Sequence, residues 1–365
     1  MIVLEDNSSD SKKTICILGA GHQGLTMAAH LALNGETVNI WNRTEQHIKK
    51  VIQSHEIICD GIIEGIGHIK KASSNISEVI SNMIMVTVPS NAYDDIAKEL
   101  APHISKDMVI ILNPGRTFGA LQFANALRKY SAKAMPYIAE TQTIVYTCRK
   151  KGTDSVTIFA LKNNVMISSV FPEKLPHILN HIPECIRPCF IMEKQYLKTT
   201  MSNVGMVLHC APVLMNVGWI ENKEANFKYY YNGISKSIAI FLEKIDEERI
   251  KVAKNLGCSI ISTKDWIEQI YHVKGNSLYD SIRQVPVYKK IDAPPTLNTR
   301  YILEDVPNGL VPIEHLGKQL AIHTPAITTI INLASMIYNT DFRSIGRKFG
   351  VDDIEEHRAF GYGST

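Results

Sequence analysis

The sequence predicts an α/β Rossmann nucleotide-binding domain followed by an all-helical domain. Three observations carry this prediction: a glycine-rich loop between a strand and a helix, a first half in which strands and helices alternate, and a second half in which long helices replace the strands. A chain of 365 residues is long enough for two domains with cores of their own. We expect a loose tail over residues 1–11, a dinucleotide-binding domain over 12–190 and a helical domain over 191–365.

The glycine-rich loop reads Gly19-Ala20-Gly21-His22-Gln23-Gly24 and has the spacing G-x-G-x-x-G. It follows an apolar run at 15–18 that predicts a buried strand, it opens an apolar helix over 23–34, and a second strand follows at 37–41. In such a loop the first glycine allows a tight turn, the second lets a pyrophosphate approach the backbone, and the third lets the helix lie close to the strand. The helix N-terminus supplies N–H groups to the phosphates. The loop is therefore predicted to bind a dinucleotide.

The end of the second strand indicates which dinucleotide. An NAD site places an Asp or Glu there to hold the ribose 2′-hydroxyl, but this chain has Asn42, Arg43 and Thr44. Arg43 can face a 2′-phosphate, and its neighbours can donate hydrogen bonds to it. NADP(H) is therefore expected in preference to NAD. The alternative is that Arg43 is a solvated surface charge and that Thr44 only caps a helix over 45–53.

The next elements continue the alternation. Two short strands are expected within 57–71, a helix over 75–82, an almost unbroken apolar central strand over 83–89, a helix over 92–100 capped by Ser90, and a strand over 108–112. Ligands bind beyond the carboxyl ends of the strands in an open parallel sheet. The candidates to line the cofactor cleft are therefore Pro89, Ser90, Asn113, Gly115 and Arg116. An Asn-Pro-Gly sequence is equally typical of a simple turn.

Strands over 136–149 and 155–160 complete the first half. From residue 194 onward the apolar residues recur at helical spacing, which predicts helices over 196–208, 234–256, 262–271 and 326–338. The second half is therefore expected to be helical throughout, with a cleft between the two domains.

Composition excludes several classes of protein. The net charge of +3, with no basic run that contains aromatic residues, gives no reason to expect a nucleic-acid partner. Seven cysteines, mostly in apolar segments, indicate reduced thiols in the cytoplasm. His181, Cys185 and Cys189 do not predict a metal site, because Pro183 and Pro188 interrupt the helix that would align them. No segment has the pattern of a signal peptide or a membrane span.

Two segments of the helical half carry polar residues that a structural helix does not need. In the first, His209 ends an apolar stretch before Pro212, and Asn203 lies six residues earlier, where it could touch the nicotinamide ribose or the substrate. A single histidine in an apolar stretch is also typical of a buried core residue. In the second, Arg300 precedes Glu304 and Asp305 in a segment with prolines and a glycine, which predicts an irregular loop. The alternative is a surface Arg–Glu pair at i,i+4.

Taken together, the chain resembles the octopine/nopaline (opine) dehydrogenase family over nearly its whole length. The residues that carry the resemblance are the glycine loop, Ala139-Glu140-Thr141, residues 146–149, Asn203 with His209 and Pro212, Asp246-Glu247-Glu248-Arg249, Arg300-Tyr301 and Glu304-Asp305-Val306-Pro307. The resemblance implies an all-helical substrate domain, a His209–Asp305 acid/base dyad, Arg300 as the clamp for a substrate carboxylate, and Asn203 near cofactor and substrate. It further implies reductive condensation of a 2-oxo acid with an amino acid or amine.

The sequence is also compatible with three functions other than that of an opine dehydrogenase. One is a 2-oxo acid or ketopantoate-type reductase, which relies on a catalytic lysine in the helical domain, for which Lys198 is the candidate. Another is a tailoring reductase that acts on a metallophore precursor or on a dehydroamino acid in a peptide. A non-enzymatic NADP-binding regulatory protein is the third. A homodimer is compatible with each of these.

Overall fold

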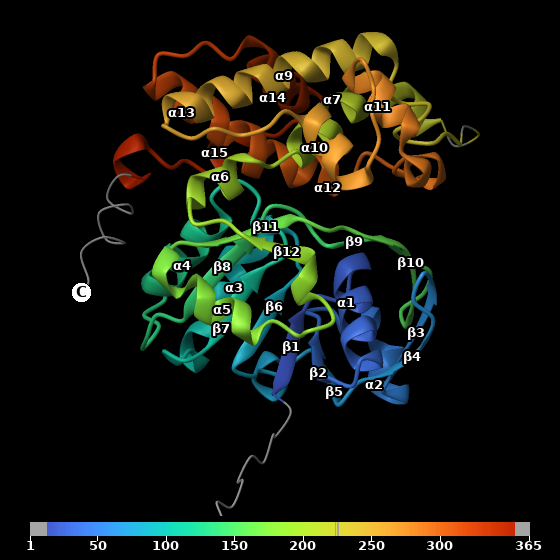
Figure 1. Ribbon diagram of the computed structural model, residues 1–365, viewed down its shortest axis with the longest axis vertical. Coiled ribbons are helices and arrows are strands. Elements are labelled where there is room, and N and C mark those ends of the chain that lie inside the picture. The colour runs from blue at the N-terminus through green and yellow to red at the C-terminus, as the bar shows by residue number, and fades with distance from the viewer. Residues whose placement is uncertain (1–12, 223, 225, 355–365) are drawn as a thin grey trace, which may run out of the picture.

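The computed structural model describes residues 13–222, 224 and 226–354. Two parts follow one another along the chain, with the sheets in the lower half of the view and the long helices in the upper half (Figure 1). The tail expected over 1–11 lies outside the described residues.

The first part is built on an eight-stranded sheet in the order β12-β11-β8-β7-β6-β1-β2-β5. All neighbouring strands are parallel except β11 and β8, which pair antiparallel. The strands are β1 Thr14–Leu18, β2 Thr37–Trp41, β5 Lys71–Ser73, β6 Met83–Val86, β7 Val109–Leu112, β8 Tyr137–Thr141, β11 Val165–Ser169 and β12 Phe190–Met192. This is the predicted Rossmann sheet, and β12 is its last strand, just before the helical part begins.

The central strands are buried on both faces, as their continuous apolar runs predict. Every residue of β6 and of β7 is buried. Alternate residues contribute to two separate cores: Ile84 and Val86 pack in the core that continues into the helical part, whereas Met83 and Met85 pack in the core beneath α1. The sheet therefore joins the two cores and brings the ends of its strands to the helical part.

A second sheet of four strands lies against α1 His22–Leu33, in the order β4-β3-β10-β9. Its strands are β3 Glu56–Gly61, β4 Gly65–His68, β9 Tyr146–Lys150 and β10 Ser155–Leu161. The predicted strand over 136–149 is therefore wrong as a single element. Residues 142–145 leave the main sheet after β8, and β9 then pairs with β10 in the smaller sheet. This change of sheet carries β9 over the start of α1.

The helices of the first part are α1, α2 Lys49–Ser54, α3 Tyr93–Leu100, α4 Gly119–Lys129 and α5 Leu175–His181. The helix predicted over 75–82 is wrong, since only a 3-10 turn, Ile76–Glu78, forms there. The carbonyl of Val79 accepts a hydrogen bond from the side chain of Asn39 at 2.8 Å and is not used within a helix. The helix predicted over 45–53 is divided into a 3-10 turn, Glu45–His47, and α2.

The second part contains helices α6 to α15. They are α6 Tyr196–Met201, α7 Gly205–Met215, α8 Val217–Glu221, α9 Lys236–Asn255, α10 Thr263–Tyr271, α11 Leu278–Gln284, α12 Arg300–Leu303, α13 Val311–Gln319, α14 Pro325–Tyr338 and α15 Phe342–Ile345. The helix predicted over 196–208 is interrupted, because the Asn203 side chain accepts from the backbone N–H of Gly205 at 3.1 Å and starts α7 afresh. Pro212 lies inside α7 and does not end it.

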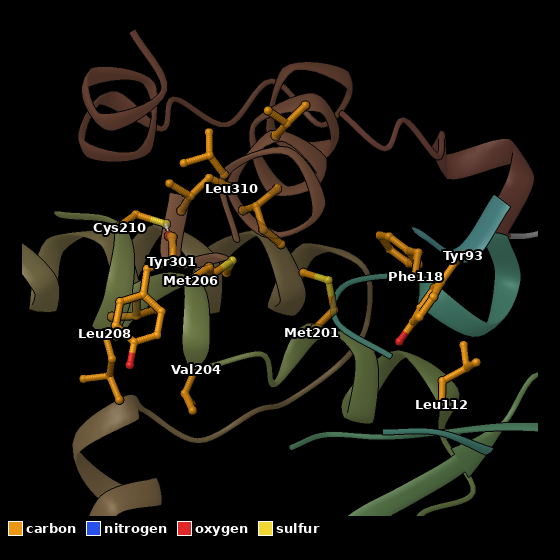
Figure 2. Packing of buried hydrophobic residues seen from close by; sticks show 14 of the residues in the cluster. Tyr93, Leu112, Phe118, Met201, Val204, Met206, Leu208, Cys210, Tyr301 and Leu310 are labelled. Atoms are coloured by element: carbon orange, nitrogen blue, oxygen red, sulfur yellow. Dashed lines mark hydrogen bonds between the residues drawn. The ribbon is translucent and has the colours of Figure 1, made fainter. Parts of the chain in front are cut away.

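The irregular loop predicted around residues 300–312 is also wrong, because this segment is helical. A π-helical turn, Val306–Leu310, connects α12 to α13. Pro307 and Pro312 lie in the first turns of their helices. A proline is tolerated there because a backbone N–H at that position would have no acceptor within the helix. Figure 2 shows Tyr301 of this segment lying along α7, next to Met206 and Leu208.

The Asp246-Glu247-Glu248-Arg249 motif holds the helical part together. Arg249 is fully buried and donates to Asp246 at 2.7 Å and to the carbonyl of Met201 at 2.7 Å. Glu248 accepts from two backbone N–H groups in the first turn of α14. These residues are structural supports. Within the described ranges, no helix combines the length and apolar character that crossing a bilayer requires.

Candidate active site

The glycine loop has the shape that a dinucleotide requires. Gly19 has a φ of +112°, and a Cβ on Gly24 would lie 1.7 Å from the carbonyl oxygen of Gly19. A Cβ on Gly21 would meet no atom within 4 Å, so protein packing does not explain this glycine. No side chain caps the N-terminus of α1 and no acidic residue occupies its first turn. The open space beside Gly21 and the uncapped N–H groups fit a pyrophosphate.

The residues after β2 have unequal freedom to contact a cofactor. The Asn42 side chain accepts from the N–H of Ala20 at 3.0 Å and donates to the carbonyl of Thr44 at 3.0 Å, so it braces the glycine loop. Arg43 is exposed, and its contact with Asp95 at 3.5 Å is between two solvated side chains. The Thr44 side chain caps no helix. Arg43 therefore has a guanidinium free to turn to another anion.

A further cation reaches the glycine loop from β9. The Lys150 ammonium donates to the carbonyls of Ala20 at 3.0 Å and His47 at 3.4 Å, and its backbone N–H donates to His22 Nδ1 at 2.8 Å. No pattern in the sequence predicts this position for Lys150. Its separation of 130 residues from Ala20 hides the contact, although it directly follows the segment 146–149 that carries part of the family resemblance.

The loops after β6 and β7 lie beneath the helical part. Ser90 is buried, its backbone N–H donates to Glu304 at 2.9 Å, and its hydroxyl accepts from Asn308. The expected capping bond from Ser90 to the following helix is absent from the described structure. Arg347 donates to the carbonyls of Ser90 and Gly115. These loops therefore join the domains.

Two other predicted cleft residues, Pro89 and Asn113, differ in exposure. Asn113, directly after β7, is buried and donates to the carbonyl of Ile111 in that strand. Pro89 is exposed. A role for Pro89, Ser90, Asn113 or Gly115 in cofactor binding stays a prediction.

The predicted histidine and carboxylate meet. His209 Nδ1 lies 2.7 Å from Oδ2 of Asp305, although the residues are 96 positions apart. His209 extends from α7, and Asp305 lies between α12 and the π-helical turn. Both are buried. Because an ionised carboxylate only accepts hydrogen bonds, Nδ1 carries the hydrogen and Nε2 is left as the acceptor.

Aromatic rings hold the imidazole in place. The ring of Tyr301 stacks on that of His209 with centroids 4.0 Å apart and an angle of 15° between the planes. The hydroxyl of Tyr230 lies 3.1 Å from His209 Nε2. Burial lowers the pKa of His209 from its ordinary value, and Asp305 opposes this effect. The neutral imidazole is therefore the favoured form near pH 7.

Arg116 is the main electrostatic partner of this site in the nucleotide domain. It is buried and contacts Glu304 Oε2 at 3.1 Å and Asp305 Oδ1 at 3.4 Å. Burial raises the pKa of Glu304, but Arg116 and Arg300 outweigh it and hold the value at about 2. Burial lowers the pKa of Arg116, but the carboxylates of Asp305 and Glu304 outweigh burial and raise this pKa above its ordinary value. The sequence predicted that Arg116 lines the cleft, but it did not predict the contacts of Arg116 with Glu304 and Asp305.

A cavity between the domains opens beside His209. Four cations line it: Arg116, Arg149, Lys162 and Arg300. Tyrosine and tryptophan side chains form much of its remaining wall, including Tyr230, Trp266, Tyr271, Tyr288 and Tyr301. Gln23 of the glycine loop also lines it. Among the described residues, no Asp or Glu side chain lines this cavity.

Of the other predicted site residues in the helical part, only Arg300 lines the cavity, whereas Asn203 and Lys198 do not. Arg300 lines the cavity and lies 3.6 Å from Glu304 at i,i+4, but Glu304 is buried, so this is not the surface pair of the alternative. Asn203 is buried at the start of α7, contacts Thr117 at 3.4 Å, and is not among the cavity residues. Lys198 pairs with Glu193 at 2.8 Å and is likewise outside the cavity. In the described part of the chain, no cluster of three potential metal ligands forms.

Comparison with known proteins agrees with this architecture. Residues 192–338 match the family described as NAD/NADP octopine/nopaline dehydrogenase, alpha-helical domain, and residues 14–115 match the N-terminus of NAD-dependent glycerol-3-phosphate dehydrogenase. An opine dehydrogenase from Arthrobacter sp. (strain 1C) is 35% identical over 338 residues, which cover 92% of this chain and 93% of that protein. The protein ocs of Agrobacterium tumefaciens (strain Ach5) is 24% identical over 94% of this chain and 96% of its own.

Solved structures share the fold over both domains. Octopine dehydrogenase in complex with NADH and agmatine superposes with a TM-score of 0.72 at 18% identity, covering 97% of this chain and 98% of that one. NADP⁺-bound yersinopine dehydrogenase superposes with a TM-score of 0.71 at 12% identity, covering 92% and 93%. The fold and the site define a two-domain NAD(P)-dependent oxidoreductase. The chain belongs to the octopine/nopaline dehydrogenase family.

Proposed function

We propose that this protein is an NADPH-dependent opine-type dehydrogenase, which condenses a 2-oxo acid with an amino acid and reduces the resulting imine. The observation that carries the proposal is the 2.7 Å contact between His209 and Asp305 beside a cationic cavity that Gln23 of the glycine loop also lines. When bound, the dinucleotide supplies the hydride for the reduction. Gly19, Gly21 and Gly24 would hold its pyrophosphate, with His22 and Gln23 at the helix N-terminus.

The cations near the end of β2 support NADPH over NADH. Arg43 is the first cation after this strand, and no carboxylate occupies the adjacent positions 42 and 44. Lys150 lies on the glycine loop and on the turn after Thr44, which adds a second positive charge at this end of the site. Asn42 would act indirectly, by holding the backbone of Ala20.

The cavity supports substrates with carboxylates and an uncharged side chain. A 2-oxo acid and an amino acid bring two carboxylates, and Arg149, Lys162 and Arg300 are available to bind them. Burial lowers the pKa of Lys162 to about 8, so an anionic partner would favour its charged form. Because the wall is aromatic and lacks a described carboxylate, an apolar or aromatic amino acid fits better than arginine.

His209 and Asp305 have the geometry of a general acid/base pair. An ammonium group must lose a proton before it can attack the carbonyl carbon, and neutral His209 can accept that proton through Nε2. Asp305 holds Nδ1 and stabilises the imidazolium that forms. The imidazolium then returns the proton to the hydroxyl that leaves as water. Arg116 keeps Asp305 in place from the opposite domain.

The decisive experiment follows NADPH absorbance with pyruvate and L-phenylalanine, each alone and together. Oxidation that requires both compounds supports the condensing enzyme. Oxidation with pyruvate alone would favour the 2-oxo acid reductase, which lacks structural support because Lys198 lies outside the cavity. Tight NADPH binding without turnover of any oxo acid and amine in a broad panel would favour the regulatory protein. Turnover only with a dehydroamino acid in a peptide would favour the tailoring reductase.

We also propose a reducing cellular compartment and a dimeric assembly for this protein. All seven cysteines are free thiols, which supports a reducing compartment such as the cytoplasm. A homodimer is proposed as the assembly, and light scattering of the purified protein tests it.

A further inference from the structure

The side chains of His209 and Tyr230 both line the cavity. Asp305 occupies the Nδ1 side, so Nε2 is the nitrogen that exchanges protons with a substrate. The partner of Nε2 is the hydroxyl of Tyr230, 3.1 Å away. The Tyr230 hydroxyl therefore lies in contact with the nitrogen that a proton from the substrate has to reach.

The packing of Tyr230 opposes displacement. Its ring stacks on that of Tyr288 with centroids 4.1 Å apart and planes 15° apart. The ring of Tyr229 meets it edge-on, with centroids 5.0 Å apart and planes 87° apart. Tyr230 is 6% exposed, and both it and Tyr288 line the cavity. The phenol is therefore held at the cavity wall, in contact with the imidazole.

We propose that the Tyr230 hydroxyl is a catalytic group that relays protons between the substrate nitrogen and His209. This inference rests on the proposed function. In the forward step the ammonium N–H bond breaks and its proton moves to the phenol oxygen, while the phenol O–H bond breaks and its proton moves to Nε2. The amine becomes neutral, the phenol is unchanged, and His209 becomes imidazolium. The reverse transfer delivers a proton to the departing hydroxyl, which leaves as water.

The hydroxyl is suited to carry protons but not to store charge. Burial raises the pKa of Tyr230 well above its ordinary value, so the phenol keeps its proton between transfers. A hydroxyl can accept one hydrogen bond while donating another, which a relay requires. A purely structural tyrosine would need only its ring in this aromatic cluster, whereas this hydroxyl meets the acceptor nitrogen of the dyad.

Tyr230→Phe tests the relay in the full-length protein, because it removes the hydroxyl and retains the ring. With NADPH, pyruvate and L-phenylalanine, we expect kcat to fall by about 10- to 100-fold with unchanged NADPH affinity. The stronger readout is the double variant Tyr230→Phe/His209→Ala. If Tyr230 acts through His209, the double variant will be no slower than His209→Ala alone. Two independent losses that multiply would overturn the relay.

Tyr229→Phe is the matched control. Tyr229 is equally buried in the same cluster, but its hydroxyl donates to the backbone carbonyl of His209 at 2.6 Å and not to the imidazole. Its loss should leave the solvent isotope effect on kcat at the wild-type value, whereas Tyr230→Phe should change it. A wild-type rate and isotope effect in Tyr230→Phe would also reject the relay. If His209→Ala kept full turnover, the proposed function itself would fail, which is a distinguishable result.

Discussion

Arg116, from the loop after β7, reaches across the domain boundary and lies 3.4 Å from Asp305 Oδ1, while Oδ2 of the same carboxylate contacts His209 at 2.7 Å. Oδ2 thus has a hydrogen bond within the helical domain, and Oδ1 has an ion-pair contact from the nucleotide domain. The nucleotide domain therefore places a positive charge beside the carboxylate that contacts His209.

Arg116→Ala should impair both stability and turnover. The change leaves the buried carboxylates of Glu304 and Asp305 without their main cation, which we expect to cost about 3 to 5 kcal/mol in the free energy of unfolding. Denaturant unfolding and kcat measured below the transition would show both losses. Arg128→Ala is the control, because Arg128 is an exposed arginine that contacts only Asn125 among its described hydrogen-bond partners. Equal stability of the two variants would contradict the role of Arg116.

His209→Ala should lower kcat by about 10² to 10⁴-fold, because the general acid/base group is lost. NADPH binding, measured by fluorescence titration, should stay near the wild-type value. His209 belongs to α7 of the helical domain, whereas the glycine loop belongs to the nucleotide domain. His103→Ala, at an exposed histidine, is the matched control. An unchanged rate in His209→Ala would remove the basis of the proposed mechanism.

The acid limb of the kcat/KM profile should report His209. The proposed mechanism needs neutral His209, and burial lowers its pKa, so the imidazole stays neutral to a lower pH than a free histidine. We therefore expect the rate to fall to half below about pH 6.5. Asp305→Asn removes the charge that favours imidazolium, so this midpoint should move to still lower pH while kcat falls. A midpoint above that of free histidine would contradict the assignment.

Arg43→Ala should weaken NADPH binding about tenfold and leave NADH binding nearly unchanged, because only NADPH carries the 2′-phosphate. Titration with both nucleotides provides the internal control. Lys150→Ala should also weaken NADPH binding, since its ammonium lies on the same loops. Equal weakening of both nucleotides by Arg43→Ala would refute the 2′-phosphate assignment.

The aromatic cavity should select the amine substrate. With pyruvate and NADPH, we expect kcat/KM for L-phenylalanine to exceed that for L-arginine by about tenfold or more, because no described carboxylate lines the cavity to pair with a guanidinium. L-Alanine serves as the small neutral reference. A preference for L-arginine over L-alanine would show that the side-chain pocket lies elsewhere.

Local patterns in the sequence were sufficient for the elements whose structure depends on neighbouring residues. The glycine spacing predicted the β1–α1–β2 unit, and continuous apolar runs predicted β6 and β7, because a strand covered on both faces needs apolar residues at every position. The same reasoning failed at 75–82 and at 300–312. In the first case a side chain from β2 takes the carbonyl of Val79, and in the second the neighbouring helices support a π-helical turn.

By itself, the sequence determined the Rossmann unit and the helical second half, since periodicity and spacing act over a few residues. The pairing of His209 with Asp305 was expected only from the resemblance to the family. Only the tertiary structure decided the distances and the other partners of this pair. It placed His209 against Asp305, Arg116 behind Asp305, Tyr230 on Nε2 and Lys150 on the glycine loop. The physical reason is that each of these contacts joins elements that are distant in the chain, and burial in a shared interface, which no local pattern encodes, brings them within hydrogen-bonding distance.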